Sequence, residues 1–394
     1  MARAGGQWCA AASVLAVVAA NHSAWAQGAR SPVIASLAAW QSQELQDAQH
    51  RGHLYQSREA SLDTGKVRYV VKYCACVDEA HGEEAAPIEG YIGMPAPSPA
   101  NWYHGGFLCV SVNGQDIGRA RLSNMLVAES GARGLVDMVW HHAPADVRVR
   151  FLALPEDDKL LVEIALDPKT EVQSLEVRAT CYPSYFTSWN HRDGARRVRT
   201  PSSLVQQGET AALPAADHWW LAYYDEVFDV AKGEGDGPCG MLVLPDEAQE
   251  LAVQCTDYPV NTTISFRPEL RRLHLAFWDW TGRSNADVLG AMPAAAARAR
   301  TDLQRADFTP APLRDFDFAG ARREVEQALA SEPVRTQLGE RLDQMQRWLA
   351  TCEPLFSRQT TTPSISSEEQ FLAAADGYRQ FSWEVKLAEL VSGL

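Results

Sequence analysis

The sequence predicts a mainly β protein, a large antiparallel two-sheet β-sandwich (a supersandwich) with an N-terminal helix and C-terminal helices. Apolar and polar residues alternate with period two through residues 65–281, in about ten short runs separated by turn residues. No helical pattern in that zone is long enough to connect parallel strands, which favours antiparallel sheets. The predicted organisation has four segments: a signal peptide (1–26), an N-terminal helical segment (27–60), the β-sandwich (61–283) and a helical C-terminal region (284–394).

Residues 1–26 have the pattern of a secretory signal peptide. Arg3 precedes an apolar stretch from Cys9 to Ala20, and Ala24-Trp25-Ala26 forms a small-x-small cleavage site. The apolar stretch is shorter than the roughly 20 residues that span a bilayer, and no later stretch is apolar enough to do so. We therefore expect export to the periplasm or the medium, with no membrane span.

The segment from Pro32 to about Ala60 is rich in Ala, Gln and Glu. Leu37, Trp40, Leu45 and Ala48 recur in it at helical spacing. This spacing predicts a helix.

The middle zone predicts a meander of antiparallel strands. Asn113-Gly114 is the strongest short hairpin signal, because both central residues of a type I′ turn need positive φ. The alternating runs predict strands at 107–112, 117–122, 135–142, 147–154, 159–166, 175–182, 219–224, 241–244, 251–255, 260–267 and 272–280.

Three helices are predicted after residue 283. Ser284 and Asp287 form a capping box for a helix to about Ala306, and Ser331 with Pro333 marks the start of a second one. Ser367 and Gln370 are the expected cap of a third, whose apolar positions are Phe371, Ala375, Tyr378, Phe381 and Val385. Their stripes can pack on the sandwich, on each other, or against a second copy.

Charge argues against nucleic acid as a partner. The chain has a formal net charge of −14, which becomes −15 when residues 1–26 and their single charged residue, Arg3, are removed. An acidic surface without a basic stripe repels a phosphate backbone.

Seven of the eight cysteines lie beyond the signal peptide, and their pairing cannot be assigned from sequence. Cys74-x-Cys76 lacks two further ligands at matched spacing, and the glycine-rich acidic loop at 233–237 lacks the ligand spacing of a calcium loop. We therefore predict no metal and no cofactor.

The first candidate site is the loop YFTSWNHRDGARRVRTP. His191 and Asp193 could move a proton, while Trp189 and Arg192 could bind a ligand, which suits a sugar with its apolar face and hydroxyl rim. The alternative is a turn at Asp193-Gly194, with Arg192 paired to a surface carboxylate.

The second candidate site is DHWWLAYYDEVFD. On a strand, His218, Trp220 and Tyr224 share one face that could meet a ligand, and Asp225 and Glu226 follow at the strand end as ligand-binding and catalytic carboxylates. The alternative is a solvated strand end. The tryptophans of the later strand, Trp278 and Trp280, could form a stacking platform for a ligand or the packing surface of the C-terminal helices, and we expect the packing surface.

These features resemble the galactose-mutarotase-like β-supersandwich domains of carbohydrate-active bacterial proteins, over roughly residues 61–283. The resemblance is carried by strand number, aromatic-rich strand ends and export, and by no diagnostic motif. The HRDG and HWWLAYYDEVFD stretches also resemble a family of exported bacterial proteins. The histidine pair and carboxylate of the mutarotases have no position-by-position match here, so no catalytic residue is carried over.

The sequence thus predicts an exported carbohydrate-associated protein that binds a glycan or sugar through aromatic and His/Asp-bearing loops. If it is an enzyme, acid–base chemistry of an epimerase, lyase or hydrolase type fits His191 with Asp193 or Glu226. The competing hypothesis is a non-catalytic envelope scaffold that holds a protein partner through its C-terminal helices.

Overall fold

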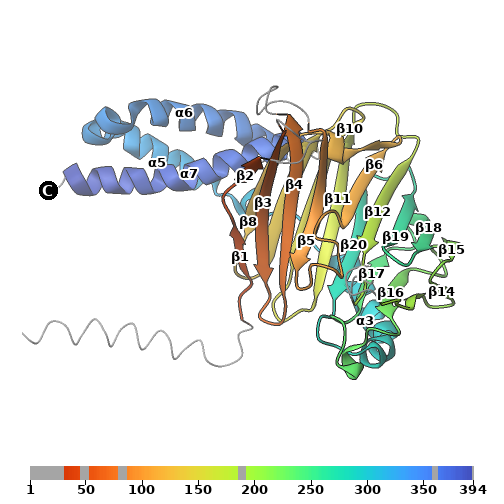
Figure 1. Cartoon of the computed structure of the whole chain (residues 1–394). Coiled ribbons are helices and arrows are strands. Elements are labelled where there is room, and N and C mark those ends of the chain that lie inside the picture. The colour runs from red at the N-terminus through yellow and green to blue at the C-terminus, as the bar shows by residue number, and fades with distance from the viewer. Residues whose placement is uncertain (1–30, 45–52, 79–86, 185–191, 357–362, 393–394) are drawn as a thin grey trace, which may run out of the picture.

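The computed structural model describes residues 31–44, 53–78, 87–184, 192–356 and 363–392. In these ranges the chain folds as two large antiparallel sheets packed face to face, with helices on one outer face and at one edge (Figure 1). The fold class predicted from the alternating pattern is therefore confirmed.

The first sheet has eleven strands within the described ranges. In spatial order its main path is β1 (Ile34–Leu37), β3 (His53–Asp63), β4 (Arg68–Asp78), β5 (Glu89–Ala96), β6 (Leu108–Val112), β12 (Leu175–Cys181), β19 (Val260–Phe266), β18 (Ala248–Cys255) and β15 (Thr210–Pro214). Two short strands lie off this path, β2 (Gln41–Glu44) on β3 and β7 (Gln115–Asp116) on β6.

The second sheet has nine strands in the described part of the chain. Their spatial order is β14 (Leu204–Gln206), β13 (Arg196–Arg199), β16 (Trp220–Asp225), β17 (Cys239–Val243), β20 (Arg272–Asp279), β11 (Lys159–Pro168), β10 (Ala145–Ala153), β9 (Gly134–His141) and β8 (Leu122–Glu129). The order from β9 to β11 matches the meander predicted from the sequence. The strand at 175–182, which was expected to continue this meander, is β12 of the first sheet, because it pairs with β6 and β19 there.

The main core lies between the sheets and is built from the inward-facing residues of both. Val149, Phe151, Val162, Leu275 and Phe277 of the second sheet are each fully buried there. Because side chains alternate across a strand, the residues between them point to the outer face of the sheet. The outer face is where the helices pack.

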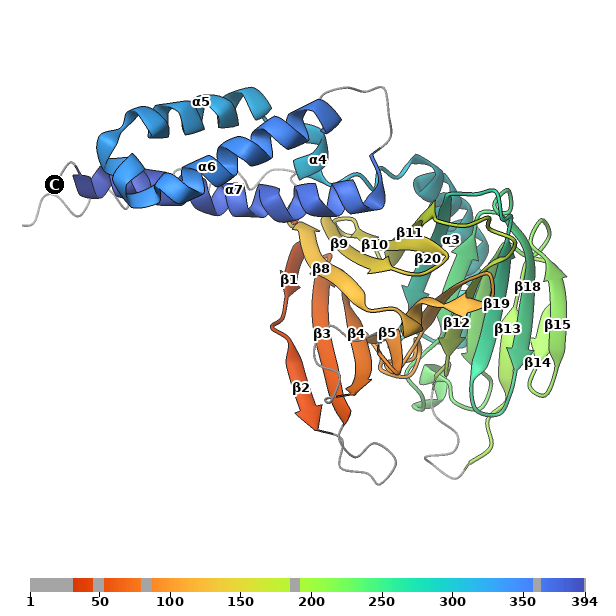
Figure 2. The same ribbon diagram turned by 90° about the horizontal axis from the view of Figure 1, so that it is seen from above.

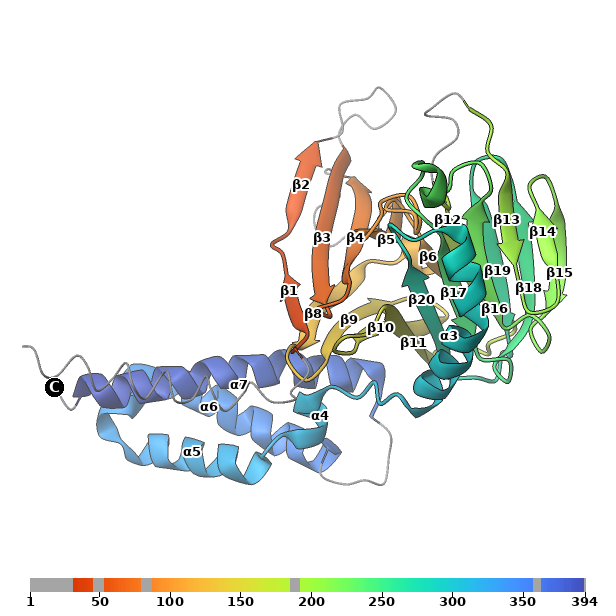
Figure 3. The ribbon, with the colours of Figure 1, turned by 90° about the horizontal axis from the view of Figure 1, so that it is seen from below.

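Helix α3 (Asn285–Arg305) lies along β16, β17 and β20 on the outer face of the second sheet (Figure 3). Its start confirms the predicted cap, because the Ser284 hydroxyl accepts a hydrogen bond from the Asp287 N–H at 3.2 Å. Val288, Met292 and Leu303 of α3 are buried against the sheet.

The other helices in the described ranges are α4 (Ala311–Asp315), α5 (Phe318–Ala330), α6 (Glu332–Phe356) and α7 (Ile365–Ser392). Helices α5, α6 and α7 share an apolar core of their own and form a bundle that extends from the sandwich past the edge strands β1 and β8 (Figure 2). Two short 3₁₀ turns, η2 (Ile117–Arg119) and η3 (Val230–Lys232), lie in loops.

The structure corrects three predicted elements. The helix expected from Pro32 to about Ala60 is replaced, in the described residues, by β1, β2 and the first part of β3, because β1 and β2 pair with β3 at the edge of the first sheet. The strand expected at 117–122 is a 3₁₀ turn followed by the start of β8. Helix α7 begins before the expected Ser367–Gln370 cap, since the Ser364 hydroxyl accepts from the Ser367 N–H.

The Asn113-Gly114 hairpin is confirmed. It connects β6 to β7, and the φ angles of Asn113 and Gly114 are 54° and 73°. Both values lie in the left-handed region that a type I′ turn requires.

Candidate functional site

The first candidate loop is described only in part. Trp189 and His191 lie outside the described residues. Arg192 and Asp193 are exposed, and the Arg192 guanidinium forms an ion pair with Glu234 at 2.9 Å and stacks over the Phe228 ring. Arg192 therefore pairs with a surface carboxylate, as the structural alternative predicted.

The second candidate group surrounds β16. Trp220 and Tyr224 are buried, and Trp220 packs in the cluster that α3 covers. Asp225 is buried as well, and its Oδ1 accepts hydrogen bonds from three backbone N–H groups, those of Ala195, Val227 and Phe228. The face that could have met a ligand is thus closed by packing, and Asp225 fixes the loop that follows the strand.

The two titratable residues that flank β16 do not meet. His218 hydrogen-bonds Thr200 at 2.8 Å, whereas the exposed Glu226 forms an ion pair with Arg197 at 3.0 Å. The six residues of β16 lie between them, a length of about 20 Å. His218 and Glu226 therefore cannot act on the same bond.

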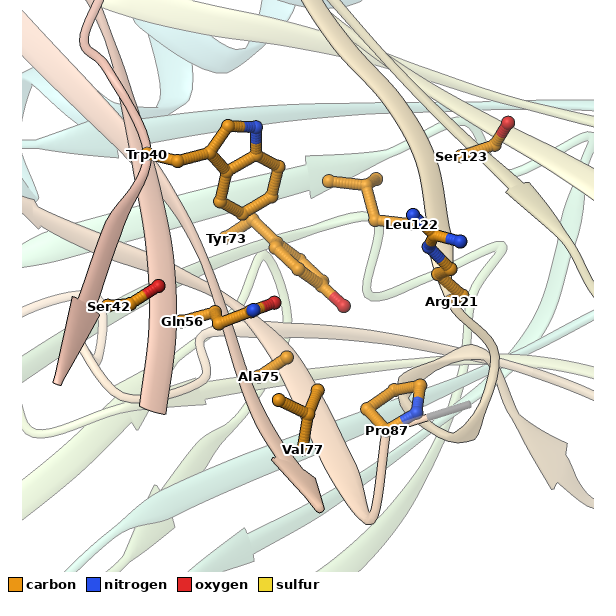
Figure 4. Close-up of a pocket in the computed structure, with 10 residues that line it drawn as sticks. All are labelled: Trp40, Ser42, Gln56, Tyr73, Ala75, Val77, Pro87, Arg121, Leu122 and Ser123. Carbon is orange, nitrogen blue, oxygen red and sulfur yellow. The ribbon is translucent and has the colours of Figure 1, made fainter. Parts of the chain in front are cut away.

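A cavity of about 300 Å³ lies elsewhere, where the first sheet overhangs the second (Figure 4). Strand β4 continues past Tyr73, while Leu122, the first residue of β8, marks the end of the opposing strand. The inward-facing Ala75 and Val77 of β4 and Gln56 of β3 line the space that this leaves. The cavity is thus a consequence of unequal strand lengths.

Two aromatic residues define one wall of the cavity. Trp40, in the loop between β1 and β2, is 47% exposed and meets Tyr73 edge to face with ring centroids 6.0 Å apart. The Arg58 guanidinium stacks over Trp40, at 5.5 Å from the ring centroid, and donates hydrogen bonds to the carbonyl oxygens of Ala38 and Met125. These contacts hold an exposed indole ring in a defined place, because Arg58 ties the Trp40 loop to β8.

Polar side chains surround the aromatic wall. Ser42, Gln56, Arg121 and Ser123 line the cavity, and Figure 4 shows them around Tyr73, with Gln56 and Ser42 on the side of Trp40 and Arg121 and Ser123 on the opposite side. Burial raises the pKa of Tyr73 to about 12, so its hydroxyl stays protonated and can donate a hydrogen bond. The cavity therefore offers an apolar ring face and several neutral hydrogen-bonding groups.

The structure also contains a row of charged residues on the outer face of the second sheet, which we call the charged row. It comprises Asp137 on β9, Arg150 on β10, Glu163 on β11 and His274 on β20, each directly opposite the next across neighbouring strands. Arg150 donates to Asp137 at 2.7 Å, and His274 donates to Glu247 through Nδ1 at 2.7 Å. Opposite charges thus alternate across four strands.

The charged row shifts the proton affinity of its members. Burial disfavours the imidazolium of His274, but hydrogen bonds to Glu163 and Glu247 outweigh it and raise the pKa of His274 to about 9. Burial acts against ionisation of Glu163 too, yet His274 and the surrounding arginines keep its pKa below the usual value. Both residues are therefore charged near neutral pH.

Helix α7 covers the charged row with its first turn. Glu368 accepts hydrogen bonds from Arg148 and Arg150, and Ile365 packs between Val139 and Ala165. At the other end of the row, His274 packs against the ring of Phe308. Because Glu368 pairs with Arg150 of the row, we assign the row the role of anchoring the first turn of α7.

Sequence reasoning missed both features, for different reasons. The charged row was visible in the sequence, since its four residues stand where the outward-facing positions of strands with an apolar inner face would otherwise be apolar, as does the neighbouring Arg148. Trp40 left a misleading signal, because its spacing from Leu37 fits a helix.

Asp279 is a further buried carboxyl group, at the end of β20. Burial raises its pKa to about 6, partly offset by hydrogen bonds from Asn101, Thr281 and the Ser98 N–H. Two chain segments, residues 98–101 and 279–281, thus meet at one carboxyl group at this end of the sandwich. Among the described residues, no group of three or more His, Cys, Asp or Glu side chains could hold a metal ion.

Comparison with known proteins gives only distant similarity. No family model matches the chain, and no curated protein matches it. Among solved structures, the α-galactosidase AgaB of Geobacillus stearothermophilus matches with 9% identity and a TM-score of 0.32, over 60% of this chain and 40% of that one. An α-mannosidase of Enterococcus faecalis matches with 7% identity and a TM-score of 0.37, over 71% and 41%.

A protein assigned as an aldose 1-epimerase, from Klebsiella pneumoniae, matches with 9% identity and a TM-score of 0.32, over 70% of this chain and 97% of that one. This chain thus corresponds to about two fifths of the α-galactosidase and of the α-mannosidase. The resemblance to galactose-mutarotase-like and glycosidase structures is weak and confined to the fold.

Proposed function

We propose that this chain is an exported protein that binds a carbohydrate in the cavity beside Trp40. The observation that carries the proposal is a half-exposed tryptophan held over a cavity whose other polar side chains are short and neutral, apart from Arg121. A pyranose presents a face of C–H groups and a rim of hydroxyls, so it needs an aromatic face beside convergent hydrogen-bonding groups.

The residues divide this recognition between them. The Trp40 indole can stack on the sugar ring, because Arg58 and Tyr73 already fix its position and little side-chain entropy remains to be lost. Ser42 and Gln56 can bind hydroxyls from the first sheet, and Arg121 can do so from the start of the second. Preorganisation of this kind supports recognition of a rigid, polar ligand.

Binding is a better description of this site than catalysis. The described residues that line the cavity include no carboxylate and no imidazole, the groups that acid–base chemistry on a sugar needs. Acid–base chemistry at His191 with Asp193 stays a prediction about a different place in the chain.

Export is part of the proposal and is supported by the pattern of residues 1–26, with Arg3, the apolar stretch and the Ala24-Trp25-Ala26 site. In the described ranges, no helix is both long and apolar enough to cross a membrane. The mature protein would meet its glycan in the periplasm or the medium.

The proposal is tested by titrating the mature protein with a panel of mono- and oligosaccharides, followed by ligand NMR line widths and calorimetry. Trp40→Ala should weaken binding of any ligand found by about tenfold or more, since stacking on an aromatic ring contributes on the order of 1 kcal/mol beyond area burial. Trp383→Ala is the matched control, because Trp383 is exposed on α7, outside the cavity.

Two results would contradict the proposal. One is a folded protein to which no sugar in a broad panel binds. The other is binding that survives Trp40→Ala and Gln56→Ala unchanged, which would place the ligand elsewhere.

A second candidate function is that of a scaffold, favoured by the free end of α7. Trp383, Leu387, Leu390 and Val391 are all more than half exposed there and follow helical spacing. If this stripe holds a partner helix, Leu387→Ser with Leu390→Ser should abolish a complex seen by light scattering or co-purification while the melting temperature stays unchanged. A complex that survives this double substitution would count against the scaffold.

A further inference from the structure

Two cysteines meet across the core between the sheets. Cys181 is the last residue of β12 in the first sheet, and Cys239 is the first residue of β17 in the second. Both are at most 1% exposed and belong to the inter-sheet core, and their side chains contact each other. In the structure no bond joins Cys181 to Cys239, and both are thiols.

The surrounding backbone fixes this approach independently. Trp102 forms a β-bridge with Cys181, and the carbonyl oxygen of Asn101 accepts a hydrogen bond from the N–H of Tyr182 at 3.2 Å. The same oxygen accepts from the Cys239 thiol at 3.7 Å. The Cys239 sulfur is therefore held beside the segment that carries Cys181.

A third thiol is near but cannot bond to Cys181. Cys255 of β18 and Cys181 of β12 both pair with Val260 of β19, one on each side of it. Two strand spacings separate them, about 9.5 Å, whereas a disulfide needs Cα atoms within about 7 Å. The geometry thus selects the partner in the opposite sheet.

We propose that Cys181 and Cys239 form a disulfide bond that joins the two sheets when the chain folds in an oxidising compartment. The oxidant is a disulfide, either of a small molecule or of a thiol oxidoreductase. The first cysteine thiolate attacks it and releases one thiolate, and the second then attacks the mixed disulfide and releases the other. Two protein thiols are thereby oxidised and one external disulfide is reduced.

The timing of this reaction follows from burial. Burial raises the pKa of the Cys239 thiol well above its ordinary value, so the folded protein holds almost no thiolate at this position. Exchange therefore takes place before the sheets close. Once formed, the bond would tie the end of β12 to the start of β17 and constrain the chain between them.

The test uses the mature chain refolded from denaturant with a mixture of reduced and oxidised glutathione. Thiols are then blocked with N-ethylmaleimide under denaturing conditions, and unreduced peptides are identified by mass spectrometry. The expected product links Cys181 to Cys239 and leaves the other five cysteines alkylated. Alkylation of both residues in the folded monomer, or a bond that includes Cys255, would overturn the proposal.

Stability provides a second readout. Dithiothreitol should lower the melting temperature of the oxidised protein by about 5 °C, since the bond restricts the unfolded chain. Cys181→Ala and Cys239→Ala should each remove this sensitivity, whereas Cys255→Ala should keep it. If the alanine variants do not fold, the peptide map of the unmodified sequence decides alone.

Discussion

Two helices cover the outer face of the second sheet, and they do so with opposite chemistry. Helix α3 packs Val288, Met292 and Leu303 against an apolar half of the face that includes the stacked Trp278 and Trp280. Helix α7 touches the other half with its first turn, where Glu368 meets Arg148 and Arg150. The remainder of α7 packs in the helical bundle.

Because the two contacts differ in chemistry, the contact of α3 and the contact of α7 with the sheet are weakened by different changes. An apolar contact is insensitive to pH and is lost only by removing volume. A buried ionic contact gives little net stability but becomes costly as soon as one charge loses its partner. Helix α3 therefore belongs to the sandwich as a structural layer, whereas the anchoring of α7 depends on the protonation state of the charged row.

The largest loss of stability is expected for a substitution in the apolar half of the outer face, under α3. Trp278→Ala should lower the free energy of unfolding by about 3–5 kcal/mol, because a fully buried indole is replaced by a cavity under α3. Denaturant unfolding measures this loss, and the exposed Trp383→Ala is the matched control, with an expected change within about 0.5 kcal/mol. Equal losses for the two variants would show that α3 does not seal the face.

The next largest loss of stability is expected for a substitution in the ionic half of the outer face, under the first turn of α7. Arg150→Met should cost about 3 kcal/mol, since it leaves the buried carboxylates of Asp137 and Glu368 without their shared partner. Hydrogen exchange should report faster opening in the first turn of α7, with α3 unaffected. Arg199→Met, at an exposed position of β13, is the control. Uniform loss of protection in both helices would contradict the independence of the two halves.

The pH dependence of stability should come from the ionic half. The pKa of His274 is about 9, above its ordinary value of 6.5, so its stabilisation is complete below pH 6.5 and is lost as pH rises to about 9. The expected loss of stability is roughly 3 kcal/mol. His274→Gln should flatten the stability profile between pH 6.5 and 9. A profile that keeps its slope in this variant would assign the dependence to other groups.

At the acid end the sign reverses. The pKa of Glu163 lies below its ordinary value of 4.5, so its stabilisation is present above that value and is lost as pH falls through the lowered pKa. The two residues together should place the stability maximum between about pH 5 and 6.5. A maximum above pH 8, measured by thermal unfolding across pH, would contradict the charged form of His274.

The smallest change in stability should come from the solvent-exposed edge of the contact between α7 and the second sheet. His141 is partly exposed and hydrogen-bonds Glu369 at 3.0 Å. Glu369→Gln should change the free energy of unfolding by about 0.5 kcal/mol at neutral pH, because solvent screens this pair. A loss as large as that of Arg150→Met would mean that the rim, rather than the buried arginines, holds α7.

Much of the β fold could be predicted because alternation reports burial directly. Strands β9 to β12 and β16 to β20 lie close to their predicted positions, since each has one face in the inter-sheet core. The N-terminal strands were mistaken for a helix because β1 and β2 are short edge strands with little buried surface, so alternation is weak there. Helix α5 was not anticipated at all.

The candidate site was harder to predict than the fold. Aromatic density pointed to Trp220 and Tyr224, but a strand sequence does not reveal whether a helix will cover its outer face. Trp40, which is the exposed ring beside a cavity, stood in a segment with a helical spacing. The cavity itself arises because β4 is longer than the strand opposite it. The two strands lie about 50 residues apart in the chain, so no local sequence pattern shows that their lengths differ.

The sequence by itself determined the two-sheet class, the order of β9, β10 and β11, the Asn113-Gly114 turn and the Ser284 helix cap, because each depends on patterns carried by residues close together in the chain. Only the tertiary structure decided which outer face α3 seals, where Glu368 finds its arginines, and which cysteine faces Cys181. These outcomes depend on how distant segments meet, and the free energy that selects them comes from burial and charge pairing between sheets and helices rather than from local propensity.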